Sequence, residues 1–183
     1  PTLGQDSKEK SIKAFGIGVI GVFVFMILFY RLSGIVACIA LLLYVMMLLL
    51  VMRYLNATLT LPGIAGIILS IGMAVDANVL IFERFKEEIR NGITLRSAMD
   101  AGFNRAFVTI FDSNVTTLMA AVILFYLGTG PIKGFAVTLA IGVILSMFSA
   151  ITVTKFLLRF LISSNFTKNP AFFGVSAPKE VNK

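Results

Sequence analysis

The sequence predicts an all-α membrane protein, a polytopic bundle of five transmembrane helices with one short cytoplasmic amphipathic helix. Hydrophobic residues make up 58% of its 183 residues and charged residues only 14%, whereas about 25% charged residues is usual for a soluble domain. Five apolar stretches approach the roughly 20 residues that a spanning helix needs. Short polar segments rich in Lys and Arg separate these stretches, as is typical of proteins that cross a bilayer several times.

The composition also argues against several classes of function. The 16 Lys and Arg residues exceed the 9 Asp and Glu residues, for a net charge of +7. Most of them lie between apolar runs, which fits membrane anchoring better than nucleic-acid binding. The chain has no His, and its single cysteine, Cys38, lies inside an apolar run. We therefore expect no intrachain disulfide, no metal site and no cofactor.

The chain begins with a polar stretch, residues 1–13, that has neither an initiator Met nor the pattern of a signal peptide. We expect this stretch to be an extracytoplasmic lead-in, and the chain to be a piece of a longer polypeptide. The first two predicted spans follow at about residues 14–30 and 34–52. The short connection between them, residues 31–34, must form a tight hairpin.

The third predicted span, residues 60–82, has a well-marked start. Thr60 can cap the helix, and Pro62 lies in the first turn, where it removes no intrahelical hydrogen bond. We expect the helix to continue past the span to Arg90 and to stop at Asn91-Gly92, a sequence that favours a helix end.

The cytoplasmic segment 83–105 is too polar to span a membrane and too patterned for a plain loop. Thr94 can cap a second, short amphipathic helix with Leu95, Ala98 and Met99 on one face. We expect this helix to lie along the membrane surface. A solvated connection with no further role is the alternative.

Two more spans, at about residues 106–127 and 134–161, complete a transmembrane domain over residues 14–162. Residues 163–183 are polar and contain two prolines, which indicates a cytoplasmic tail or linker. Basic residues near the span ends predict the orientation, with the N-terminus outside and the C-terminus in the cytoplasm. The basic residues assigned to the cytoplasm are Arg84, Lys86, Arg90, Arg96, Arg105, Lys155, Arg159 and Lys168.

Small residues repeat every four positions in the third and fifth spans, a spacing that lets helix backbones approach closely in lipid. We expect these two spans to be buried against their neighbours. The small residues are Gly66, Ser70 and Ala74 in the third span, and Gly134, Thr138, Gly142 and Ser146 in the fifth.

Two acids lie inside predicted spans. A charged side chain at the centre of a spanning helix costs roughly 2.5 to 3.5 kcal/mol, so such residues are functional candidates by default. Asp76 lies seven residues before Glu83, and Asp112 lies seven residues after Arg105. Each acid is thus about 10 Å from its helix's cytoplasmic end, so we expect the two at equal depth on consecutive antiparallel helices.

Other polar residues accompany the acids, but no Lys or Arg is predicted at their depth. An acid without a cation in hydrocarbon must be protonated, hydrogen-bonded, or paired with a cation from another subunit. Each state allows the acid to take up and release a proton, as coupling to a proton gradient requires. The alternative is that the polar residues only hold helices together. The candidates for this supporting network are Asn78, Thr109, Asn114 and Thr116.

Two sequence motifs point to a known family. The run GMAVDANVLIFERFKEE (residues 72–88) and the run FDSNVTTLMAAVILFYLGTGPIKGFAVTLAIGV (residues 111–143) resemble the membrane part of the SecD/SecF family, in the resistance-nodulation-division superfamily. The resemblance covers nearly the whole chain. It implies that the chain corresponds to spans two to six of a six-span protein, without the first span and the large extracytoplasmic domain that follows it.

The resemblance also implies a function and partners. Members assist the export of proteins with the energy of a proton or sodium gradient, in the cytoplasmic membrane of bacteria or archaea. Asp76 matches the acid that the family uses for ion coupling, and Asp112 lies in the family's second polar motif. The resemblance therefore implies that both acids belong to the ion or proton relay. The implied partners are a SecF-like half, the SecY channel complex, exported polypeptides held by the extracytoplasmic domain, and the lipid bilayer.

Three other functions remain open from the sequence. A related exporter of the same superfamily would share this fold. An intramembrane aspartyl protease would use two acids that share a proton. Such proteases resemble G-x-G-D and Y-D patterns, whereas here Val75 precedes Asp76 and Phe111 precedes Asp112. A structural module would dock a partner without moving ions. We favour a transport subunit that is not an enzyme.

Overall fold

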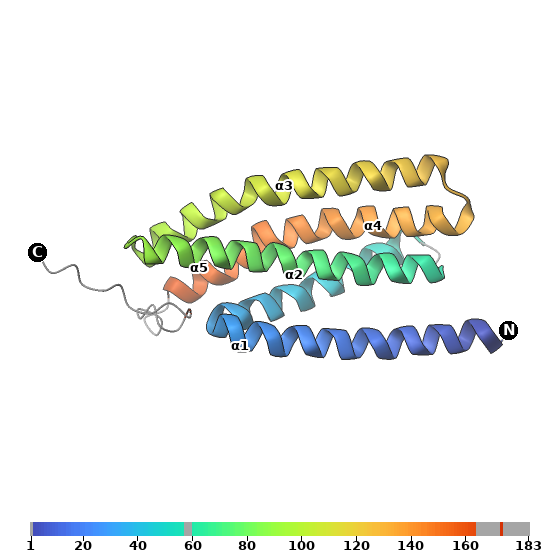
Figure 1. Ribbon diagram of the computed structural model, residues 1–183, viewed down its shortest axis with the longest axis horizontal. Coiled ribbons are helices and arrows are strands. Elements are labelled where there is room, and N and C mark those ends of the chain that lie inside the picture. The colour runs from blue at the N-terminus through green and yellow to red at the C-terminus, as the bar shows by residue number, and fades with distance from the viewer. Residues whose placement is uncertain (1, 57–59, 164–172, 174–183) are drawn as a thin grey trace, which may run out of the picture.

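The structure is a computed structural model that describes residues 2–56, 60–163 and 173. The described part is all-α, as predicted. Its elements are α1 (Thr2–Tyr54), α2 (Leu61–Arg90), α3 (Leu95–Leu127), α4 (Gly130–Phe148), the π-helix η1 (Ser149–Thr154) and α5 (Lys155–Ser163). The long helices lie side by side along one axis, and α2 contacts α1, α3 and α4 (Figure 1).

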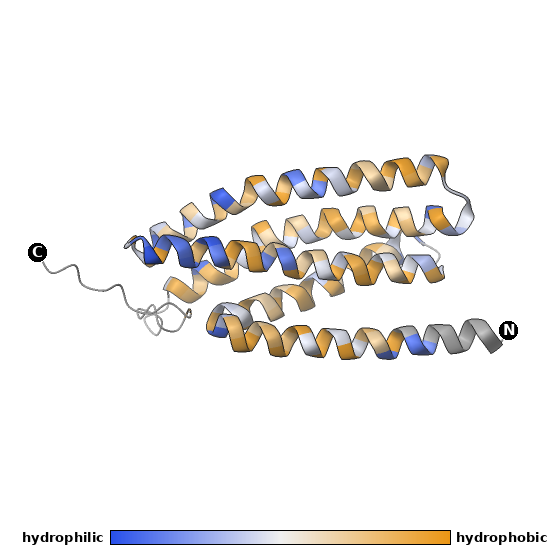
Figure 2. Cartoon of the chain, viewed as in Figure 1, coloured by the Kyte–Doolittle hydropathy of each residue, from blue (hydrophilic) through white to orange (hydrophobic). Residues whose placement is uncertain are grey.

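Four helical stretches are long and apolar enough to cross a membrane: Ile12–Tyr54, Leu61–Arg90, Leu95–Leu127 and Gly130–Ser163. The last is formed by α4, η1 and α5 together. Many large apolar side chains are exposed on these helices, and hydrophobic residues run along most of their length (Figure 2). An exposed apolar surface of this extent is suited to lipid, so the chain is a multi-pass membrane protein.

Helix α1 reverses direction in its middle. Arg31 has φ 48° and ψ −115°, outside the helical region, and the two arms of α1 run in opposite directions (Figure 1). A Cβ on Gly34 would overlap the carbonyl group of Met26, so the close return of the chain requires glycine. The hairpin predicted at residues 31–34 is confirmed.

Both ends of α2 follow the sequence signals. The Thr60 hydroxyl accepts a hydrogen bond from the Gly63 amide at 3.1 Å, with proline in the first turn. At the other end the helix stops at Asn91, and Gly92 adopts φ +82°, a conformation that favours glycine. The predicted start, extension and stop of this helix are confirmed.

The prediction of a separate, short helix that starts after Thr94 and lies along the membrane surface is wrong. Leu95 is instead the first residue of α3, which continues unbroken into the next span. Ala98 and Met99 are buried, and a Cβ on Gly102 would lie 2.8 Å from the backbone nitrogen of Phe85. The apolar face therefore packs on the C-terminal part of α2 rather than on the membrane surface, because glycine lets the two backbones meet there.

Small residues bring α2 and α4 together. A Cβ on Gly66 would meet the hydroxyl of Thr138, and a Cβ on Gly142 would meet the side chain of Ser70. Helix backbones approach this closely in membranes only where side chains are small. Of the remaining small residues, Ala74 and Ser146 are buried, and Gly134 is half-buried against Thr60.

The last span is not a regular α-helix. Six residues, Ser149–Thr154, form a π-helix between α4 and α5. A π-helix places one extra residue in the turn and so rotates the side chains that follow it. The Ser149 hydroxyl donates to the Ala40 carbonyl on α1 at 3.2 Å, while Thr154 faces α2. The span expected over residues 134–161 is therefore interrupted by a π-helix. Its polar side chains contact both α1 and α2, which the four-residue spacing of a regular helix does not predict.

The terminal segments belong only partly to the described structure. Helix α1 begins at Thr2, so the polar lead-in is helical where it is described. The tail predicted over residues 163–183 lies outside the described residues except for Ser163 and Phe173. The Phe173 ring is fully buried and packs edge-on against Phe85, with ring centroids 5.4 Å apart.

Candidate functional site

Asp76 lies in the middle of α2 and faces a cavity between α2 and α3. The cavity has a volume of about 290 Å³. One wall comes from α2 and the other, which carries three polar side chains, from α3. The lining residues are Met73, Asp76, Ala77 and Leu80 on α2, and Ile110, Ser113, Asn114 and Thr117 on α3.

No cation accompanies this acid among the side chains that the structure describes. The described residues that line the cavity include no Lys or Arg. Four ion pairs of the described residues lie toward the end of the bundle where α2 meets α3, and neither Asp76 nor Asp112 takes part in them. The pairs are Arg84–Glu87, Lys86–Glu83, Arg105–Glu88 and Lys155–Asp100.

Asp112 does not lie in the cavity. The next two residues, Ser113 and Asn114, line the cavity opposite Asp76, so both acids lie at a similar height on neighbouring helices. Asp112 is exposed, as Asp76 is, but it lies on the face of α3 that points away from the cavity-lining residues, the outer face of this helix. The structure thus brings Asp76 together with hydroxyl and amide groups rather than with a second carboxyl group.

The four supporting residues separate into two groups. Asn78 and Asn114 are buried, at 3% and 7% exposure, whereas Thr109 and Thr116 are exposed on the outer face of α3. The Thr116 hydroxyl donates to the backbone carbonyl of Asp112 at 3.0 Å, within its own helix. The two threonines and Asp112 therefore form part of an outward polar stripe, not of the cavity wall.

Asn78 connects the acid-bearing helix to the last span. Its side-chain oxygen accepts a hydrogen bond of 2.8 Å from the hydroxyl of Thr154, and Thr154 is fully buried. The prediction that Asn78 faces a different helix from Asp76 is confirmed. Sequence reasoning missed Thr154 because the π-helix, which carries no simple sequence signal, turns this residue toward α2.

Thr154→Val is expected to destabilise the bundle by about 1 kcal/mol, since a side chain of similar shape would leave the buried oxygen of Asn78 without its donor. Thr154→Ser keeps the hydroxyl and should lose clearly less. Unfolding by titration with sodium dodecyl sulfate, followed by far-ultraviolet circular dichroism, measures both variants. Equal losses for the two variants would show that packing of the methyl group matters and that the hydrogen bond does not.

A second buried polar contact was also missed. The hydroxyl of Tyr44, a fully buried residue on the second arm of α1, donates to Ser70 at 2.9 Å and lies 3.3 Å from the Gly142 carbonyl oxygen. A tyrosine surrounded by leucine and methionine suggests only lipid exposure from sequence. The repeat of small residues in α2 and α4 could have indicated this contact, because small side chains leave room for the Tyr44 hydroxyl between the two helices.

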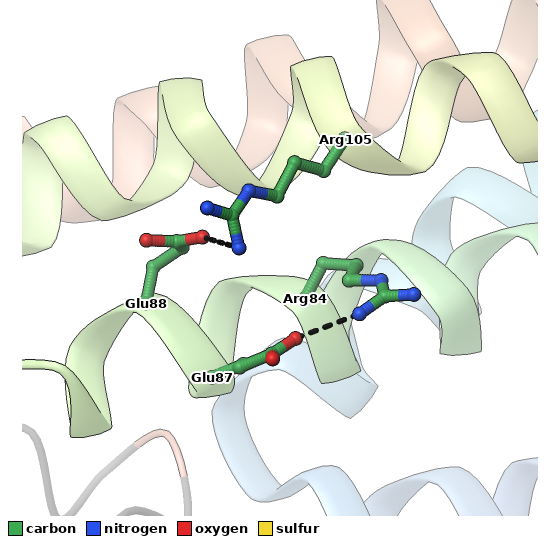
Figure 3. A network of polar contacts seen from close by, with 4 residues as sticks. All are labelled: Arg84, Glu87, Glu88 and Arg105. Atoms are coloured by element: carbon green, nitrogen blue, oxygen red, sulfur yellow. Dashed lines mark hydrogen bonds and ion pairs between the residues drawn. The ribbon is translucent and has the colours of Figure 1, made fainter.

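Charged side chains gather at the end of α2 that meets α3. The carboxylate of Glu88 is buried, at 2% exposure, and lies 2.7 Å from Nη1 of Arg105 on α3 (Figure 3). The ammonium group of Lys86 lies 3.4 Å from Glu83 and 4.1 Å from the ring centroid of Tyr30 on α1. These contacts tie α1, α2 and α3 together beside the cavity but outside it.

The cavity has the chemistry of a site for a proton or a small cation. A single carboxyl group can bind either, and the hydroxyl and amide groups opposite can donate or accept hydrogen bonds in either state.

Comparison with known proteins gives one consistent result. The family model for "Protein export membrane protein SecD/SecF, C-terminal" matches residues 1–164. The protein translocase subunit SecD of Acidaminococcus fermentans is 76% identical over 177 residues, which is 97% of this chain and 42% of the relative. The SecD of Dictyoglomus turgidum is 61% identical over 163 residues, or 89% of this chain and 41% of the relative.

A solved structure is similar as well. The crystal structure of SecDF from Thermus thermophilus, which is described as a translocon-associated membrane protein, superposes with a TM-score of 0.86 at 46% identity. The match covers 88% of this chain and 22% of that one. The chain thus spans less than half the length of each of these relatives.

Proposed function

Because the chain belongs to the SecD/SecF family of protein-export membrane proteins, whose C-terminal membrane part it matches, we propose that it uses an ion gradient to assist protein translocation, with Asp76 as the ion-coupling acid. The family places the chain with transport proteins rather than enzymes. The coupling ion would be a proton, or sodium.

The position of Asp76 carries the proposal. Its carboxyl group lies on an apolar helix, faces a cavity of about 290 Å³, and has no ion-pair partner in the described part of the chain. An acid placed there without a binding role would only add the insertion cost of a charge. The test replaces Asp76 with Asn and measures protein export with and without the gradient.

The geometry disfavours an intramembrane aspartyl protease. Such an enzyme needs two carboxyl groups close enough to share a proton, and Asp112 is exposed on the outer face of α3 rather than in the cavity with Asp76. The family match likewise favours protein export over the other exporters of the superfamily.

We propose five spans, because the two antiparallel arms of α1 are each long enough to cross the bilayer separately. Residues 1–13 would lie outside, residues 14–162 would form the membrane domain, and residues 163–183 would lie in the cytoplasm. The positive-inside rule supports this direction, since the end where α2 meets α3 carries Arg84, Lys86, Arg90, Arg96 and Arg105.

Cysteine labelling tests the span number and direction together. In a Cys38→Ala background, which has no cysteine, Glu9→Cys, Tyr54→Cys and Gly130→Cys should react with a membrane-impermeant maleimide added to intact cells. Ile93→Cys should react only in inverted vesicles. Labelling of Glu9→Cys and Tyr54→Cys from opposite sides would show that α1 crosses once, and a full reversal would overturn the orientation.

The outer face of α3 is the proposed contact with a SecF-like half. Of the four candidate spans α3 is the least buried, and it exposes Thr109, Asp112 and Thr116 in a polar stripe that lipid would not solvate. The SecY channel complex and the exported polypeptide are proposed partners of the whole protein, because the relatives are named translocase subunits and the solved relative is described as translocon-associated.

A further inference from the structure

A second, larger cavity lies far from Asp76, between the first turn of α3 and α5. Its volume is about 730 Å³, within the usual range for a small-molecule site. Two arginines and several apolar side chains line it. The arginines and the large apolar side chains of the lining include Leu95, Arg96 and Met99 on α3, and Phe156, Arg159 and Phe160 on α5.

The two arginines give the pocket an unbalanced positive charge. No Asp or Glu is among the lining residues, and neither Arg96 nor Arg159 forms an ion pair with a described carboxylate. Neighbouring cations differ in this respect, because Arg105 is paired with Glu88 and Lys155 with Asp100. Both lining guanidinium groups are exposed and so remain able to bind an anion, preferably a phosphate.

Most of the other lining side chains are apolar, and Thr94 and Ser163 are the two that are not. Phe156 and Phe160 are 69% and 73% exposed, and such exposed apolar rings are suited to contact with hydrocarbon. A soluble phosphate would use the arginines but would leave these rings without a partner. A molecule with both an anionic head and hydrocarbon chains would contact the arginines and the apolar side chains together.

We propose that this pocket binds one anionic phospholipid, with its phosphate on Arg96 and Arg159 and its acyl chains along Phe156 and Phe160. Basic pockets between membrane helices at the cytoplasmic side recognise anionic headgroups by the same chemistry. The chain's own residues 164–183 are a poorer occupant, because they carry three Lys and one Glu and the two arginines would repel them. The site is separate from Asp76 and does not depend on the proposed ion coupling.

A tryptophan reporter tests the proposal. The chain contains no tryptophan, so Phe160→Trp places a single fluorophore in the pocket. The variant chain is reconstituted in phosphatidylcholine vesicles with a few per cent of brominated lipid, which quenches nearby tryptophan. We expect brominated phosphatidylglycerol to quench at about 25-fold lower mole fraction than brominated phosphatidylcholine, because two arginines each contribute about a fivefold preference.

Two charge variants distinguish this pocket from general surface charge. Arg96→Gln/Arg159→Gln should abolish the preference for phosphatidylglycerol, whereas Arg84→Gln/Arg90→Gln removes the same charge from the same end of the bundle and should keep it. Equal quenching by both lipids in the starting protein would overturn the proposal. So would equal losses in the two double variants, displacement by soluble glycerol phosphate, or a preference that appears only after residues 164–183 are deleted.

Discussion

Asp76→Asn is expected to abolish the part of protein export that depends on the ion gradient while the helix bundle stays assembled. Asn fills the same volume and can hydrogen-bond to the polar groups across the cavity, but it cannot gain or lose a proton. One charge moved through 100 mV supplies about 2.3 kcal/mol, roughly a 50-fold bias, and the variant should lose this stimulation entirely. The measurement is export of a secreted protein with the gradient present and after an ionophore collapses it.

Asp112→Asn is the matched control, since it removes a carboxyl group at a similar height on the neighbouring helix. Asp112 is exposed on the outer face and does not line the cavity, so its replacement should leave most of the gradient dependence in place. Asp76→Glu, which keeps a titrating group, should recover part of the activity. Full gradient-dependent export by Asp76→Asn would refute the assignment of this acid as the ion carrier.

The sequence predicts the depth of these groups better than their direction. Counting residues from Glu83 to Asp76 and from Arg105 to Asp112 places the acids at similar heights because the helical rise is constant. The side of the helix that each acid faces depends on where the neighbouring helix lies. The structure therefore agrees with the height of Asp112 but turns its side chain away from Asp76.

Local signals were reliable where a backbone conformation required a particular residue. Thr60 marks the start of α2, Gly92 takes a positive φ at its end, and Gly34 permits the return of α1. Two features could not be predicted from the sequence because they arise only from packing. The first turns of α3 look like a surface helix until Gly102 is placed against the Phe85 backbone, and Thr154 faces Asn78 only because of the π-helix.

Arg105→Gln is expected to lower the stability of the bundle by about 3 kcal/mol. Its partner Glu88 is only 2% exposed, and the two side chains meet at 2.7 Å between α2 and α3 (Figure 3). Loss of the arginine would leave a buried carboxylate without a cation, which costs about 3 to 5 kcal/mol in comparable pairs. We place the effect at the low end because the Arg105 side chain is 58% exposed. Unfolding by titration with sodium dodecyl sulfate measures the loss.

The neighbouring ion pair in Figure 3 provides the control. Arg84 and Glu87 also meet at 2.8 Å, but their side chains are 42% and 48% exposed, and exposed pairs of this kind contribute about 0 to 1 kcal/mol. Arg84→Gln should therefore change stability little. Glu88→Gln should cost less than Arg105→Gln, because the arginine that it leaves behind reaches solvent. If the two arginine variants lose equal stability, burial of Glu88 is not the origin of the effect.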